Sequence, residues 1–137
     1  MFKKEVCVAP VESSANGILV VDQLRDYGIE QLRLHFENGK IVSFKAEKGS
    51  DTFKKTLKKA KGDKDRIAEL GIGINCGMKP IGWRVYDKKA LGTAHIAIGN
   101  NIHLGGVNKA SIHIDFVLHN PTIKADDKII MDTGKPS

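Results

Sequence analysis

The chain has few aromatic residues, few cysteines and no long apolar run, and each shortage narrows what the protein can be. Aromatic residues make up 6% of its 137 residues, and Cys7 and Cys76 are its two cysteines. A membrane-spanning helix needs about 20 consecutive apolar residues, and no such stretch is present. The N-terminal segment MFKKEVCVAP lacks the apolar core of a secretory signal. The two cysteines lie far apart in the sequence and form no CxxC pair. Because there are only two, we expect reduced thiols and a cytoplasmic location.

The shortage of aromatic residues also argues against RNA binding. The net charge is +6, and basic proteins often bind nucleic acid. Nine of the 22 lysines and arginines, however, are concentrated within residues 45–66, where Phe53, Leu57 and Ala60 recur with helical spacing. The lysines are therefore interpreted as the solvated flanks of an amphipathic helix over residues 50–61. No aromatic RNA-binding motif accompanies them, so we do not expect a nucleic-acid partner.

What the chain has instead is 14 glycines and many β-branched residues, arranged as short strands. Asn38-Gly39 separates two alternating apolar runs, residues 32–36 and 41–44, which is typical of a β-hairpin. Further strands are expected at residues 5–9, 18–21, 94–98, 111–118, 122–124 and 129–131.

A second helix is expected from about Asp63 to Glu69 or Leu70, ended by Gly71 and Gly73. No internal repeat or linker divides the chain, and its length suits a single domain. We therefore predict one α+β domain over residues 1–137, β-dominated, with a mixed or antiparallel sheet and two short helices.

The most informative residues for function lie in the C-terminal half. In the expected strand 111–118, His113 and Asp115 share one face, because residues two apart in a strand point the same way. An imidazole and a carboxylate suit a divalent metal ion, and His95 on a neighbouring strand would add a ligand. No cation adjoins the His113–Asp115 pair in the sequence, so we expect a metal to balance it.

Taken singly, the other candidates have ordinary interpretations. Glu5 would be an exposed strand end, Glu69 the last carboxylate of a helix, and His95 a hydrogen-bonded core residue. Glu5 adjoins an apolar run, however, and Glu69 precedes glycines that let the backbone approach another group closely. The metal hypothesis therefore depends on these residues converging.

An ordered set of segments resembles the C-terminal part of the thermophilic metallo-aminopeptidases, the aminopeptidase T and aminopeptidase S type with leucyl-aminopeptidase-like relatives. The resemblance covers nearly the whole chain. The segments that carry it are Glu5-Val6, Pro10, Ser14, Asn16-Gly17, HFENGKIV at residues 35–42, AELGIGIN at residues 68–75, LGTAHIAIGN at residues 91–100, Gly105-Gly106 and His113-Ile114-Asp115.

The resemblance implies a metal-dependent hydrolase. The resemblance implies ligand positions for one or two divalent ions, which would be Zn, Co or Mn, with Fe possible. The residues that match these positions are Glu5, Glu69, His95, His113 and Asp115. A metal-activated water would attack an N-terminal peptide bond. Glu69 is the candidate for the general base, and the substrate would be a peptide or another small molecule.

Two features depart from the family pattern. Members carry a large N-terminal domain before the equivalent of Glu5, whereas Met1 lies four residues upstream here, so we expect that domain to be absent from this chain. A homo-oligomer, or a separate subunit that supplies the missing domain, would then complete the protein. The family's tyrosine after the His95 equivalent is also missing, and Ile102 or His103 stands near its place.

Two other functions fit the same residues. The chain could be a non-catalytic metal-binding subunit. It also resembles an iron-dependent ring-cleaving dioxygenase, because His95, His113 and Asp115 form a two-His-one-carboxylate set for non-haem Fe(II). In each case we expect the carboxylates to repel one another without metal, so that metal-free Asp115→Asn melts at or above the wild type.

Overall fold

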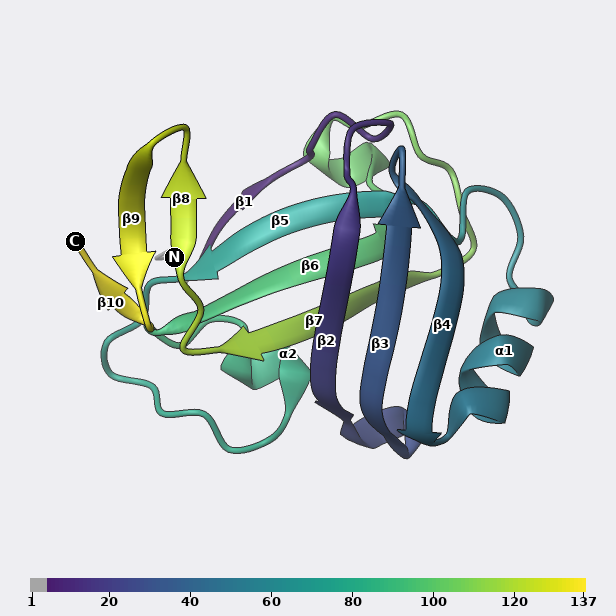
Figure 1. The fold of residues 1–137 in the computed structure, drawn as a ribbon, viewed down its shortest axis with the longest axis horizontal. Coiled ribbons are helices and arrows are strands. Elements are labelled where there is room, and N and C mark those ends of the chain that lie inside the picture. Colours follow the sequence, from purple (N-terminus) through teal and green to yellow (C-terminus); the bar gives the residue numbers. More distant parts are fainter. Residues whose placement is uncertain (1–4) are drawn as a thin grey trace.

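The computed structural model describes residues 5–137. A four-stranded and a three-stranded antiparallel sheet pack face to face, and a small third sheet lies at one end (Figure 1). The four-stranded sheet has the order β1-β5-β6-β7, formed by Glu5–Val8, Ile67–Gly73, Thr93–Gly99 and His113–His119. The second sheet has the order β2-β3-β4, formed by Gly17–Leu24, Ile29–Glu37 and Lys40–Lys48.

Short elements complete the fold. The third sheet contains β8 (Ile123–Ala125), β9 (Lys128–Asp132) and β10 (Lys135–Pro136). The helices are α1 (Ser50–Lys59) and α2 (Arg84–Asp87), with 3-10 turns at Arg25–Tyr27 and Ile102–Leu104. Among the described residues, no helix is long and apolar enough to cross a membrane.

The core lies between the two larger sheets, whose strands cross one another in Figure 1. Ile98, Ile114 and Phe116 of the four-stranded sheet are fully buried in one apolar cluster with residues of β2 and β3. Phe53 of α1 closes the edge of this cluster, with its ring edge-on to Phe44 at 4.9 Å between centroids. Because the apolar residues of β6 and β7 are used here, alternate residues of the same strands face the other way.

The structure confirms the β-dominated α+β fold with antiparallel sheets and two short helices. The expected hairpin at Asn38-Gly39 is present between β3 and β4, and both turn residues have positive φ, as the tightest hairpin turns require. The helix over residues 50–61 is also confirmed, as Ser50–Lys59.

The predicted second helix over residues 63–70 is wrong. Residues Ile67–Gly73 form β5, which pairs with β1 and β6, and the second helix is α2 further along the chain. Ala68, Glu69 and Leu70 favour helix in isolation, but pairing on both sides outweighs that weak preference. Glu69 is therefore a central-strand residue and not the end of a helix.

Candidate metal centre

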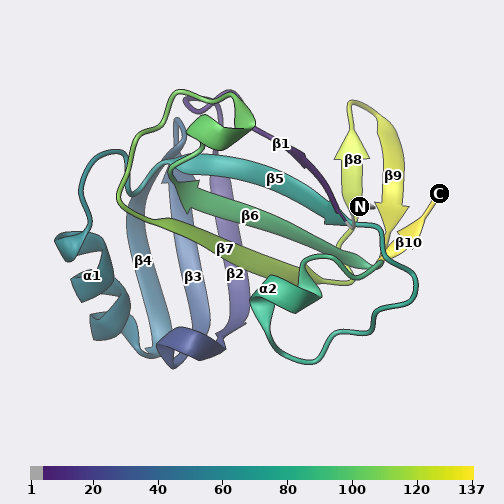
Figure 2. The same ribbon diagram turned by 180° about the vertical axis from the view of Figure 1, so that it is seen from behind.

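In Figure 2, the face of the β1-β5-β6-β7 sheet that is turned away from β2-β3-β4 is toward the viewer. All four strands contribute polar side chains to this face. In the strand register, Cys7 lies opposite Gly71, which lies opposite His95. Directly paired residues of antiparallel strands point to the same face, as do alternate residues along each strand. The ionisable residues of the centre on this face are Glu5, Cys7, Glu69, His95, His113 and Asp115.

Glu69 joins the two histidines of this cluster. Its Oε1 lies 3.1 Å from His95 Nε2, and its Oε2 lies 3.0 Å from His113 Nε2. His113 Nε2 is also 3.3 Å from Asp115 Oδ1, and His95 Nε2 is 3.8 Å from Glu5 Oε2. The structure thus brings together all five residues that the sequence predicted as ligands, although they span most of the chain.

The ring of His113 is oriented by the backbone. Its Nδ1 lies 2.7 Å from the carbonyl oxygen of Asn100, to which it donates, so Nε2 faces the two carboxylates. Its contacts with Asp115 and then with Glu69 raise the pKa of His113 to about 10. Without a metal, His113 therefore carries the positive charge that the carboxylates require.

The Glu69 carboxylate is almost fully buried, at 3% exposed. Burial alone would raise its pKa, but contacts with His113 and His95 outweigh this and hold the pKa of Glu69 well below its usual range. Both of its oxygens are engaged by imidazoles. Glu69 is therefore an ionised bridging group rather than a ready proton acceptor.

The missing side chain of Gly71 leaves the space that the His95 ring occupies. A Cβ on Gly71 would lie 2.0 Å from Cε1 of His95, closer than any real contact allows. The glycine that looked like a helix terminator therefore leaves room for an imidazole to lie across the sheet.

Gly71→Ala should displace the His95 ring and lower the free energy of unfolding by about 1–3 kcal/mol through overpacking. Gly77→Ala is a matched control, because its Cβ would meet nothing nearer than 3.4 Å. Urea denaturation of both variants measures the difference. Equal stability of the two variants would show that the space beside His95 is not needed.

Cys7 is a member of the cluster that the sequence interpretation missed. Its Sγ lies 3.8 Å from His95 Nε2, and one potential ligand group contains Glu5, Cys7, Glu69 and His95. Burial raises the pKa of the Cys7 thiol far above its usual value. The sequence feature that could have identified Cys7 is its position two residues after Glu5, which places both side chains on one face of the strand.

Lys88 is the second residue that was missed. Its Nζ donates to Asp115 Oδ2 at 3.2 Å and lies 3.7 Å from Glu5 Oε1. Burial lowers the pKa of Lys88, but the carboxylates of Asp115 and Glu5 outweigh it, so the net shift is upward. The expectation that no cation neighbours the His113–Asp115 pair is therefore wrong. Lys88 is 27 residues from Asp115 along the chain, and only the fold brings them together.

Asp87 holds the turn that carries Lys88. Its carboxylate is 1% exposed and accepts the backbone N–H groups of Ile81 at 2.7 Å and Gly82 at 2.8 Å. Asp87→Ala leaves both donors unpaired and should cost about 1–3 kcal/mol of unfolding free energy, whereas Asp87→Asn keeps one acceptor and should cost less. Thermal melts of the two variants measure this ranking, and the reverse ranking would contradict it.

The donor set fits a divalent cation. Carboxylate oxygens and imidazole nitrogens of Glu69, His113 and Asp115 lie within 4.8 Å of one another, as do the ligand atoms of the group containing Cys7. Within residues 5–137, the buried Glu5 Oε2 and His95 Nδ1 have no hydrogen-bond partner. A buried carboxylate oxygen without a hydrogen-bond partner is costly, and a cation or a proton donor beside it would satisfy it.

The remaining histidines differ in their distance from the cluster. The ring of His103 lies edge-on to His113, with 5.3 Å between centroids, so it borders the cluster. His35 lies on β3 and pairs with Glu37 on the exposed side of the other sheet. His119 lines a separate cavity.

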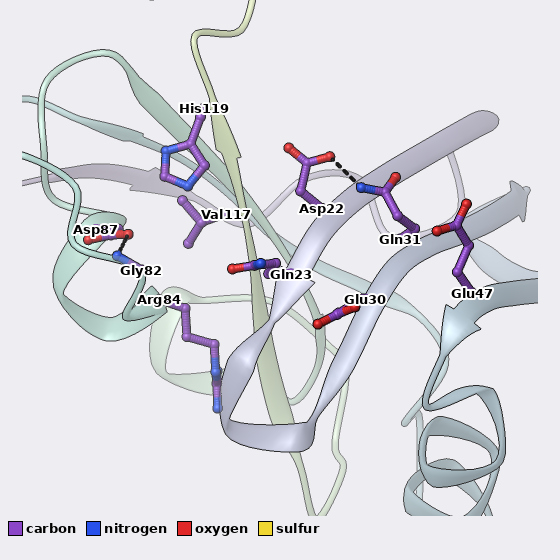
Figure 3. A pocket seen from close by; sticks show the side chains of 10 residues that line it. All are labelled: Asp22, Gln23, Glu30, Gln31, Glu47, Gly82, Arg84, Asp87, Val117 and His119. Atoms are coloured by element: carbon purple, nitrogen blue, oxygen red, sulfur yellow. Dashed lines mark hydrogen bonds between the residues drawn. The ribbon is translucent and has the colours of Figure 1, made fainter.

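That cavity has a volume of about 500 Å³ and lies between β2, β3, β4, α2 and the end of β7 (Figure 3). Asp22, Glu30 and Glu47 give it an acidic wall, and His119 lies across from them. Its one buried acid, Asp87, is already bound to backbone N–H groups. None of the five predicted ligands lines it.

Comparison with known proteins assigns the chain to a family. The family described as thermophilic metalloprotease matches residues 1–135. Aminopeptidase AmpS of Bacillus subtilis (strain 168) is 28% identical over 148 aligned residues, which cover 92% of this chain and 36% of the relative. The chain therefore spans about a third of the length of that curated relative.

Solved structures share the fold. The 2,5-dihydroxypyridine dioxygenase of Pseudomonas putida KT2440 matches with a TM-score of 0.77 and 22% identity, over 96% of this chain and 42% of that one. Wild-type AmpT of Thermus thermophilus matches with a TM-score of 0.72 and 22% identity, over 97% and 39%. The structural likeness alone does not separate a peptidase from a dioxygenase, but the family match extends over nearly every residue described above. This chain belongs to the thermophilic metalloprotease family.

Proposed function

We propose that this chain carries the metal-binding catalytic part of an aminopeptidase-like hydrolase, which cleaves an N-terminal peptide bond. The observation that carries the proposal is the convergence of Glu5, Glu69, His95, His113 and Asp115 on one sheet face, with Glu69 between the histidines. Family membership supports metal-dependent aminopeptidase chemistry. A divalent ion bound here would supply an activated water and polarise the scissile carbonyl.

Each residue has a separate task in this proposal. Glu69 holds the two imidazoles in place and binds the ion, because both of its oxygens face ring nitrogens. His113 is oriented through Asn100. Glu5 is the better candidate for the proton acceptor, because its Oε2 has no hydrogen-bond partner in the described part of the chain and lies 3.8 Å from His95 Nε2. This assignment replaces Glu69 as the candidate general base.

The roles of the two glutamates are separable by mutation. Glu5→Gln should reduce kcat while most of the metal remains bound, whereas Glu69→Gln should lose the metal itself. The loss of affinity in Glu69→Gln should exceed the about 10- to 100-fold that follows removal of a residue that merely supports a ligand. Metal retained in Glu69→Gln would contradict its ligand role.

Hydrolysis of an aminoacyl p-nitroanilide tests the proposal, with chelator and then with Zn²⁺, Co²⁺ or Mn²⁺. Activity should appear with metal, and the same substrate blocked by an N-acetyl group should react far more slowly. His113→Ala should be inactive, and His35→Ala should match the wild type, because His35 lies on the other sheet. Absence of hydrolysis with all three metals would overturn the proposal.

A ring-cleaving dioxygenase is the second candidate, favoured by one observation on this chain. His95, His113 and Asp115 share a sheet face and supply the residue types of the two-His-one-carboxylate set that suits Fe(II). Glu5 and Glu69 would then lack a role, although Glu69 contacts both histidines. Oxygen consumption with Fe(II) and a dihydroxypyridine, together with no hydrolysis, would favour this candidate.

A further inference from the structure

We propose that Lys88 takes the place of a second metal ion, so that this centre binds one divalent cation per chain. The inference rests on the proposed function, because it concerns how many ions that site accepts. It is carried by the contacts, burial and anchoring of Lys88, and by the charge of the residues around it.

Lys88 lies between the two potential ligand groups. One group contains Glu5, Cys7, Glu69 and His95, and the other contains Glu69, His113 and Asp115. The Lys88 ammonium contacts one carboxylate of each, Asp115 Oδ2 at 3.2 Å and Glu5 Oε1 at 3.7 Å. An ammonium is a compact charge with three donors, so it can bind both carboxylates at once and hold a positive charge beside each ligand group.

Burial and hydrogen bonds of the surrounding turn fix the position of Lys88. Its side chain is 16% exposed, and its backbone N–H, just after the end of α2, donates to the carbonyl oxygen of Arg84 at 3.1 Å. The preceding Asp87 holds this turn through its carboxylate, and its carbonyl oxygen accepts the Thr93 hydroxyl of β6 at 2.9 Å. The turn that carries Lys88 is therefore tied to the same sheet that carries the ligands.

The charges of the cluster favour one divalent ion. Glu5, Glu69 and Asp115 contribute three negative charges, and Lys88 returns one positive charge. With the histidines neutral as ligands, a single divalent ion balances the remaining two. A second divalent ion would leave excess positive charge in a largely buried site, which is unfavourable. Removing Lys88 lowers that excess from two positive charges to one, so a second ion becomes less unfavourable.

The experiment counts metal rather than activity. Wild type, Lys88→Met, Lys88→Arg and the control Lys89→Met are treated with chelator, loaded with Zn²⁺, dialysed and measured by elemental analysis. Lys89→Met removes the same charge one residue away. We expect one zinc per chain in wild type, Lys88→Arg and Lys89→Met, and two in Lys88→Met. Circular dichroism confirms that each variant is folded, and Lys88→Gln, which also removes the charge and should bind two zinc ions, replaces Lys88→Met if that variant fails to fold.

Each outcome has a distinct meaning. Two zinc ions per wild-type chain would overturn the role of Lys88 and leave the proposed hydrolase intact. One zinc in both wild type and folded Lys88→Met would also overturn it, because Lys88 would then not limit the count. No zinc bound by either protein would overturn the proposed function itself, and this inference with it.

Discussion

Addition of Zn²⁺, Co²⁺ or Mn²⁺ to chelator-treated protein should raise its Tm strongly. A ligand that binds only the native state at a hundredfold excess over its Kd stabilises by about 2.7 kcal/mol. For a domain of this size that corresponds to a rise of about 8–15 °C. The ligand atoms come from strands β1, β5, β6 and β7, so unfolding separates them and the ion has no comparable site in the unfolded chain. Differential scanning fluorimetry across a metal titration measures the shift.

Two histidine variants separate the site from the rest of the chain. His113→Ala should lose most of the Tm response, whereas His35→Ala should keep it, because His35 is half-exposed on the other sheet. A Tm that is unchanged by every metal would leave the cluster as a set of structural ion pairs.

The structure also reverses the expectation for metal-free Asp115→Asn. The expectation assumed unbalanced repulsion among the acids, but Lys88 and His113 both contact Asp115. The neutral variant leaves these cations with less compensation, so without metal it should melt below the wild type. Melts with chelator compare the two proteins directly, and an Asp115→Asn Tm at or above the wild type would restore the repulsion argument.

Metal affinity should rise steeply with pH. The folded-state pKa of His113 is raised to about 10, above its ordinary value of about 6.5, by contacts with Asp115 and Glu69. The stabilisation it provides without metal is therefore full below about pH 6.5 and is lost as pH rises through about 10. A metal ion must displace that proton, so affinity should increase by about tenfold per pH unit in this window.

Calorimetric titration with Mn²⁺ between about pH 6.5 and pH 8.5 measures this dependence, with about a 100-fold gain in affinity expected. Proton release on binding, obtained from buffers of different ionisation enthalpy, provides an independent check. An ordinary histidine would give a plateau above about pH 7.5. Such a plateau would show that the imidazolium of His113 is not held by its carboxylates.

The sequence predicts those parts of the site that depend on period-two alternation within one strand. His113 and Asp115 share a face, with Ile114 and Phe116 buried on the other, because pleating alone requires it. The same rule applies to Cys7, two residues after Glu5. The Asn38-Gly39 turn is equally local, since its backbone needs residues that tolerate positive φ.

The other parts of the site depend on contacts between segments that are far apart in the sequence, which no short stretch of residues reveals. Residues 67–73 become a strand because β1 and β6 bond to both of its edges, and this moves Glu69 from a helix end to the middle of the cluster. Lys88 reaches Asp115 across 27 residues through the α2 turn. The convergence of all five predicted ligands agrees with the family resemblance. The resemblance reflects which strands pair in the fold, whereas the spacing of residues along the sequence does not. Association with another copy or subunit stays a prediction.

Anomalous diffraction from crystals grown with Zn²⁺ tests the central claim most directly, because it locates the ion itself. The account predicts an anomalous peak within bonding distance of Glu69 and of at least one of the two histidines that Glu69 contacts, His95 and His113, on the sheet face away from β2-β3-β4. The peak should be absent in crystals of Glu69→Gln. Zinc bound elsewhere, such as at the exposed Cys76 or at His119, with none beside Glu69, would contradict the claim that this cluster is a metal centre.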